Sequence, residues 1–176
     1  MPKTYRKMLT DWQAPYIMSI LKLIETQSKT TIVSWCIDYC QMRLLPIYEA
    51  AVTDDSRPRA AITAARDWLS GKIKLPEAKK IILECHAAAR EVPDNPTAQA
   101  AARAIGQCAS TIHAPTHSAG LMFYGALAVA YDTLGIDASW DEILKVARAE
   151  CIRMEDALRD IAVEGESNPA KINWNC

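Results

Sequence analysis

Residues 139–161 read SWDEILKVARAECIRMEDALRDI and form the strongest helical pattern in the 176-residue chain. Ser139 and Glu142 have the spacing of a capping box, in which each side chain bonds the backbone N–H of the other residue. Apolar side chains then recur every three or four residues on one face of the helix. They are Trp140, Ile143, Leu144, Ala147, Cys151, Met154, Leu158 and Ile161. The pattern predicts a long amphipathic helix packed against a core.

The rest of the chain also carries helix signals, and the composition supports them. Twenty-eight alanines against six valines and one phenylalanine favour helix over sheet. Asp11 has the position of an N-cap for a first helix, and Ser28 has that position for a second helix over residues 29–52. Pro46 lies inside the second pattern and should kink that helix without ending it. In all, these patterns predict about seven helices and no strand.

One segment, Ser118–Thr133, has no polar face along most of its length, so neighbouring helices must surround it. Alanine-rich helices pack closely because small side chains let their backbones approach. We therefore expect an all-α protein, a single antiparallel helical bundle with Ser118–Thr133 as its central apolar helix. The bundle should span residues 1–163. Residues 164–176 lack periodicity and should form a tail that crosses the surface, anchored by Trp174.

The sequence predicts a cytoplasmic location. The basic residues at the N-terminus are not followed by a long apolar stretch or a small-residue cleavage site, so we expect no secretory signal. The uncharged run around residues 118–131 is too short to span a bilayer, so we expect no membrane partner. Without export, the cysteines should be reduced and act as small buried apolar side chains. They are Cys36, Cys40, Cys85, Cys108, Cys151 and Cys176.

The charge distribution excludes one class of partner and points to one surface. Twenty Lys and Arg against 21 Asp and Glu give a net charge of −1, which argues against a protein that coats nucleic acid. Residues 137–166 hold four basic and nine acidic groups. The last helix is therefore expected to carry an acidic outer face, which is either solvated or a docking surface for a basic partner. Its candidate contact residues are Glu150, Glu155 and Asp160.

No catalytic or cofactor motif is present, so the sequence predicts no catalytic residue, no cofactor and no enzyme. Three histidines, His86, His113 and His117, form the one cluster that could do chemistry, because imidazoles with a carboxylate can hold zinc or iron. Pro115 prevents a regular helical register between the last two, so their spacing is not a ligand signature. A structural role, a metal site and contact with a partner or ligand all stay open.

A second polar cluster is D-D-S-R-P-R at residues 54–59. As an anion site it would need free arginine forks that converge with helix N–H groups. As a structural corner it needs only internal ion pairs. Both interpretations stay open, and either could extend into a polar network through Arg66, Asp67, Arg90 and Arg103.

Several segments, taken in order, carry a family resemblance. They are WCIDYCQMRLLPIYE (35–49), DDSRPRAAITAARDW (54–68), GKI (71–73), ECHAAAR (84–90) and AAARAIGQCASTIHAPTHSAG (100–120). Over residues 30–133 the chain resembles the immunity-five-like family, small helical immunity proteins associated with bacterial polymorphic toxin systems. The most specific part is the D-D-x-R-P-R stretch followed by H-A-A-A-R and the H-x-x-x-H corner.

The resemblance implies a cytoplasmic bacterial protein that binds a cognate toxin domain and neutralises it by occlusion, and it offers no catalytic residue to transfer. Such binding needs a rigid bundle and a patch that buries on the order of 800 Å². The positions that match the family motifs form either a binding site or a shared core. They are Asp55, Arg57, Arg59, Trp68, His86, Arg90, His113 and His117. The alternatives are a metal- or ligand-binding protein or enzyme built on the three histidines, and a helical homodimer.

Overall fold

The computed structural model describes residues 4–175, which form helices joined by short loops, with no strand among them. The all-α prediction is therefore confirmed. Cys176 and the outer ends of the predicted segments 1–163 and 164–176 lie outside the described residues. The α-helices are α1 (Pro15–Ile24), α2 (Lys29–Tyr39), α3 (Leu45–Ala51), α4 (Arg57–Leu69), α5 (Leu75–Arg90), α6 (Pro96–Ser110), α7 (Ala126–Leu134) and α8 (Trp140–Ile161).

Helices α2 and α3 are one continuous helix that passes Pro46 through a π-helical turn, Cys40–Leu44. In this wider turn the Leu45 N–H bonds the Cys40 carbonyl, five residues back. A proline ring clashes with the carbonyl one turn earlier in a regular α-helix, and the wider turn accommodates it. With α2 and α3 counted as one, the described residues contain the predicted seven helices.

The predicted helix starts are right in two cases and wrong in one. The Ser28 hydroxyl accepts a hydrogen bond from the Thr31 N–H at 3.3 Å and caps α2. The Ser139–Glu142 capping box is present at the start of α8. Asp11 does not cap α1, which begins at Pro15 without a side-chain cap. Pro15 has no N–H to satisfy, so the first turn of α1 has less need of a capping side chain.

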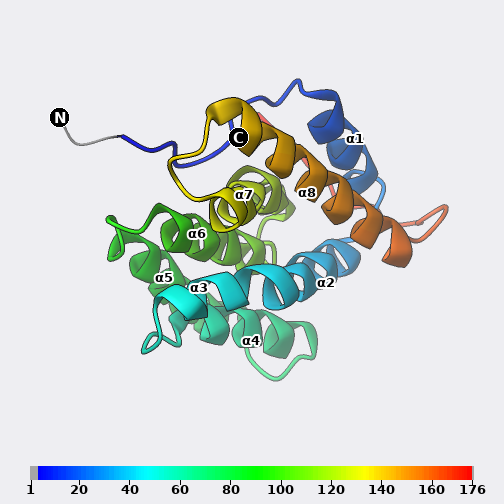
Figure 1. The fold of residues 1–176 in the computed structure, drawn as a ribbon. Coiled ribbons are helices and arrows are strands. Elements are labelled where there is room, and N and C mark those ends of the chain that lie inside the picture. Colours follow the sequence, from blue (N-terminus) through cyan, green and yellow to red (C-terminus); the bar gives the residue numbers. More distant parts are fainter. Residues whose placement is uncertain (1–3, 176) are drawn as a thin grey trace.

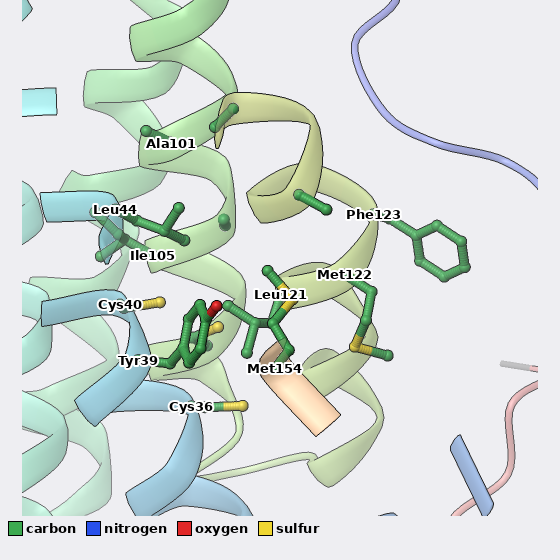
Figure 2. Packing of buried hydrophobic residues seen from close by; sticks show 14 of the residues in the cluster. Cys36, Tyr39, Cys40, Leu44, Ala101, Ile105, Leu121, Met122, Phe123 and Met154 are labelled. Carbon is green, nitrogen blue, oxygen red and sulfur yellow. The ribbon is translucent and has the colours of Figure 1, made fainter. Parts of the chain in front are cut away.

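The interior of the bundle is formed by α6 and by the helical segment that ends in α7 (Figure 1). Helix α6 contacts α2, α3, α4, α5 and α7, and its alanines are buried on most sides. The predicted central helix, Ser118–Thr133, is also buried, and contains a π-helical turn, Leu121–Gly125. Around Gly125 the side chains of Leu44, Leu121 and Met154 converge (Figure 2).

The tail lies against the N-terminal part of the bundle. The Ala170 N–H donates to the Gln27 carbonyl at 2.8 Å. The Trp174 indole N–H donates to Glu25 at 2.6 Å, and its ring lies 6.3 Å from that of Trp12. Trp174 therefore anchors this segment as expected. Within residues 4–175, no helix has both the length and the apolar composition of a membrane span.

Candidate functional site

The D-D-S-R-P-R stretch forms internal ion pairs between α3, α4 and α5. Arg57 donates to both carboxylate oxygens of Asp55, at 2.9 and 2.7 Å, and its outer edge pairs with Glu91 at 2.6 Å. The Tyr48 hydroxyl also donates to Asp55, at 2.8 Å. Arg59 pairs with Glu49 at 2.7 Å. Both arginine forks are occupied, so the geometry supports the structural corner and gives no support to an anion site.

The corner also perturbs the ionisation of its members. The Arg57 guanidinium lowers the pKa of Asp55 to about 2, against the opposing effect of burial. At the other end of α4, Trp68 is half-buried against the core, with the Lys29 ammonium 5.2 Å from its ring centroid. Arg66 pairs with Asp38 at 2.7 Å and so connects α4 to α2, separately from the ion pairs of residues 54–59.

The three histidines are close in space, and each is held by neighbours from the bundle. The rings of His113 and His117 have centroids 5.0 Å apart. His117 Nδ1 lies 2.7 Å from the Gln107 side-chain oxygen, so this nitrogen donates. Because the Ser110 hydroxyl donates to the Gly106 carbonyl, His86 Nε2 is the donor in its 3.4 Å contact with Ser110.

The histidine cluster is a neutral group in basic surroundings. Burial lowers the pKa of all three imidazoles. Positive neighbours lower the pKa of His86 and His113 further, including Arg90 and Arg103 near His86. In the described part of the chain, no group of three His, Cys, Asp or Glu side chains is arranged to hold a metal ion. The metal interpretation of the cluster therefore has no support in the geometry.

Arg90 and Arg103 complete a surface that we call the basic face, made of His86, Arg90, Arg103 and His117. Six of the ten arginines pair with a carboxylate in the described chain, whereas Arg90 and Arg103 make no ion pair there. The paired ones are Arg43, Arg57, Arg59, Arg66, Arg153 and Arg159. Arg103 instead lies 6.0 Å above the ring of Tyr124. The basic face thus presents two unpaired cations and two imidazoles from α5, α6 and the turn Pro115–Ser118.

A cavity that we call the aromatic hollow adjoins the basic face: His117 lines it, and so does Tyr124, whose ring lies under Arg103. Its volume is about 520 Å³. Trp12 lies 4.3 Å from Phe123, centroid to centroid, and with Trp174 forms much of its wall. The other lining residues are Met8, Gln107, Ala114, Thr116, Ala119, Gly120 and Asn173. Gln107 and Tyr124 were not identified from the sequence. Gln107 lies one helical turn after Arg103 on α6, and this spacing could have indicated that the two residues share a face of the helix.

Glu150 lies in the interior and not on the outer face of α8, so the predicted placement is wrong. Its side chain is fully buried and accepts a 2.6 Å bond from the Tyr39 hydroxyl. Arg43 and Arg153 also donate to it, each at 3.1 Å. Burial opposes its ionisation, but these hydrogen bonds, above all that from Arg43, prevail and keep the pKa of Glu150 below its usual value.

The acidic outer face predicted for α8 is absent from the described helix. Glu155 is half-buried and bonds Ser19 at 2.8 Å and Arg159, while Asp160 is exposed. The exposed charges of α8 balance: Asp141, Glu142, Asp156 and Asp160 against Lys145, Arg148, Arg153 and Arg159. The net negative charge of residues 137–166 comes instead from the buried Glu150, the half-buried Glu155 and the flanking loops. Segment charge therefore did not predict the charge of the helix surface.

A family model described as "Imm-5 like putative immunity protein" matches residues 22–157 of the chain. The match extends from within α1 to within α8 and includes every residue of the basic face. No curated protein and no solved structure matches the chain.

Proposed function

Because the chain belongs to the Imm-5 like putative immunity protein family, we propose that it is an immunity protein that binds a cognate toxin domain and neutralises it by occlusion. The family match over residues 22–157 is the observation that carries this proposal. Occlusion requires a stable surface and no chemistry of its own. The internal ion pairs of Asp55, Arg57 and Glu150 suit such a role, since they stabilise the bundle and leave these groups without a free reactive position.

The proposal places the protein in the cytoplasm of a bacterial cell. The described cysteines are free and buried, which suits a reducing compartment. As apolar side chains in the core they contribute to packing, and their burial protects them from reaction.

The test is co-expression with the toxin domain encoded beside the gene. Colonies are counted with the toxin alone, with both proteins, and with the toxin plus an unrelated helical protein of similar size. We expect rescue only with this protein, together with a stable complex on a sizing column. Failure of soluble, folded protein to rescue the cells or to form the complex would contradict the proposal.

A further inference from the structure

We propose that the basic face and the aromatic hollow together form the docking surface for the toxin domain, and that the matching surface of that domain is rich in carboxylates. An apolar side chain of the same partner would enter the hollow. This inference rests on the proposed function, because it names the chemistry of the partner that the immunity protein occludes.

The arginines of this bundle differ in whether they have a carboxylate partner. Six of the ten arginines use a carboxylate of this chain, so internal pairing is the rule in this bundle. The other four arginines make no ion pair within the described residues. Arg6 and Arg148 line a cavity that Asp11 and Asp141 also line, whereas Arg90 and Arg103 both lie near His86. Glu91, which follows Arg90 in the chain, is paired with Arg57. Arginine forks fit carboxylates in a bidentate geometry, so Arg90 and Arg103 suit an acidic partner. Charge complementarity of this kind selects partners and speeds association.

The aromatic hollow lies beside Arg103. Tyr124 connects the two features, since its ring lies under Arg103 and also lines the hollow. Trp12 and Trp174 are partly exposed there, and aromatic walls of this size take up an apolar side chain. Binding energy at interfaces concentrates in such desolvated pockets, whereas charged rims contribute specificity. The combination therefore predicts one apolar anchor surrounded by carboxylates.

Close packing holds this surface rigidly. A Cβ on Gly120 would lie 2.4 Å from the Gln107 Cβ, so the segment that carries His117 approaches α6 without room for a side chain. A Cβ on Gly106 would lie 2.7 Å from the His86 ring, so α5 and α6 approach equally closely. A surface fixed in this way loses little conformational entropy when a partner binds.

A protein partner fits this surface better than a nucleic acid. The histidines are neutral near pH 7 because burial and their basic neighbours lower their pKa. Arg90 and Arg103 are then the only permanent charges of the basic face. Binding to a phosphate backbone depends on neutralising many phosphates, and two cations on a chain of net charge −1 supply little of that.

The experiment compares two charge-reversal variants in binding to the toxin domain encoded beside the gene. The test variant is R90E/R103E. The control is R148E, because Arg148 also lies 6.0 Å above a tyrosine ring, that of Tyr16, and makes no ion pair in the described chain. We expect the test variant to bind at least about 100-fold more weakly at low salt, and the control to bind within about threefold of wild type.

Wild-type affinity in a folded R90E/R103E protein would overturn the inference and leave the immunity proposal intact. Failure of the wild-type protein to bind the toxin would contradict the proposed function itself, so the two failures are distinguishable. If R90E/R103E does not fold, the neutral variant R90Q/R103Q takes its place. We then expect about a tenfold loss of affinity for the toxin domain, and an unchanged affinity would overturn the inference. Tight binding of a labelled single-stranded oligonucleotide by wild type, lost in R90E/R103E, would also overturn it.

Discussion

The Tyr39 hydroxyl donates a 2.6 Å hydrogen bond to Glu150 in the buried contact between α2 and α8. Arg43 and Arg153 form ion pairs with the same carboxylate from the surface side, and their side chains are 40% and 65% exposed. One buried acid therefore satisfies a buried hydroxyl and two guanidiniums. A second bond, from the Trp35 indole N–H to the Met154 carbonyl at 2.9 Å, connects the same two helices.

Replacement of Glu150 by alanine should destabilise the protein strongly. E150A leaves the Tyr39 hydroxyl buried without its acceptor and removes the partner of two guanidiniums. Since both arginines keep access to water, we expect a loss of about 2–4 kcal/mol in the free energy of unfolding. Urea unfolding followed by circular dichroism measures it. The control, E155Q on the same helix, should change stability by less than about 1 kcal/mol. Equal stability of E150A and wild type would contradict the assigned contacts.

The sequence predicted the helices better than it predicted which side of each helix is buried. Ser28 and Ser139 gave correct helix starts because a cap acts locally and the spacing to its N–H partner is fixed. Glu150 was misplaced because a carboxylate is buried only where Tyr39 and Arg43 supply hydrogen bonds, and those residues are more than a hundred positions away.

The candidate site was predictable only in part, for a similar reason. His86, Arg90 and His117 stood out in the family motifs. Their joining with Arg103 into one surface depends on the close approach of α5 and α6 at Gly106, which no local pattern encodes. The aromatic hollow combines Trp12 and Trp174, from opposite ends of the chain, so only the fold brings its walls together.

Replacement of Gly120 by alanine should disturb the close approach of its helical segment to α6. The new Cβ would lie 2.4 Å from the Gln107 Cβ, a group fixed to the backbone of α6 that cannot rotate away. Overpacking of this kind costs about 1–3 kcal/mol of unfolding free energy, measured by urea denaturation. G125A is the matched control, because its nearest neighbours are the flexible ends of Leu44 and Leu121, and it should cost less. A larger loss in G125A than in G120A would contradict this packing.

Asp55 should stabilise the protein in a pH-dependent manner. Its pKa falls from 3.8 to about 2 in the folded protein, chiefly because Arg57 donates to it. A lowered carboxyl pKa means that the stabilisation is complete above about pH 4 and is lost as the pH falls toward 2. The Arg57 side chain is 30% exposed, so screening reduces the effect of D55N at pH 7 to about 1–2 kcal/mol.

Urea unfolding of D55N from pH 5 to pH 2 checks this expectation. The variant should lose less stability than wild type across that range, because it lacks the titrating group. Asp54, which is adjacent and exposed, makes no ion pair in the described chain, so D54N is the control and should behave as wild type. An identical pH dependence of D55N and wild type would contradict the role assigned to Asp55.

The histidine cluster should destabilise the folded protein below neutral pH. Burial lowers the pKa of His86, His113 and His117 below the ordinary value of 6.5, so the unfolded chain binds protons more readily. Their contribution to stability is therefore complete above pH 6.5 and declines as the pH falls below it. Unfolding free energies from pH 8 to 5.5 should show this slope. H113Q, at the most exposed of the three positions, should reduce it, and an unchanged slope would contradict the assignment.

If the proposed docking surface is correct, binding of the toxin domain should take up protons at these histidines. Folding favours the neutral imidazoles of His86 and His117, but a carboxylate-rich surface placed over the basic face raises their pKa, because it favours the charged form. Affinity should therefore increase as the pH falls from 8 to 6, opposite in sign to the change in stability. Calorimetric titration with the toxin domain, in two buffers of different ionisation enthalpy, counts the protons directly. If binding releases protons or exchanges none, the carboxylates of the toxin domain do not lie next to these imidazoles, which would contradict this prediction.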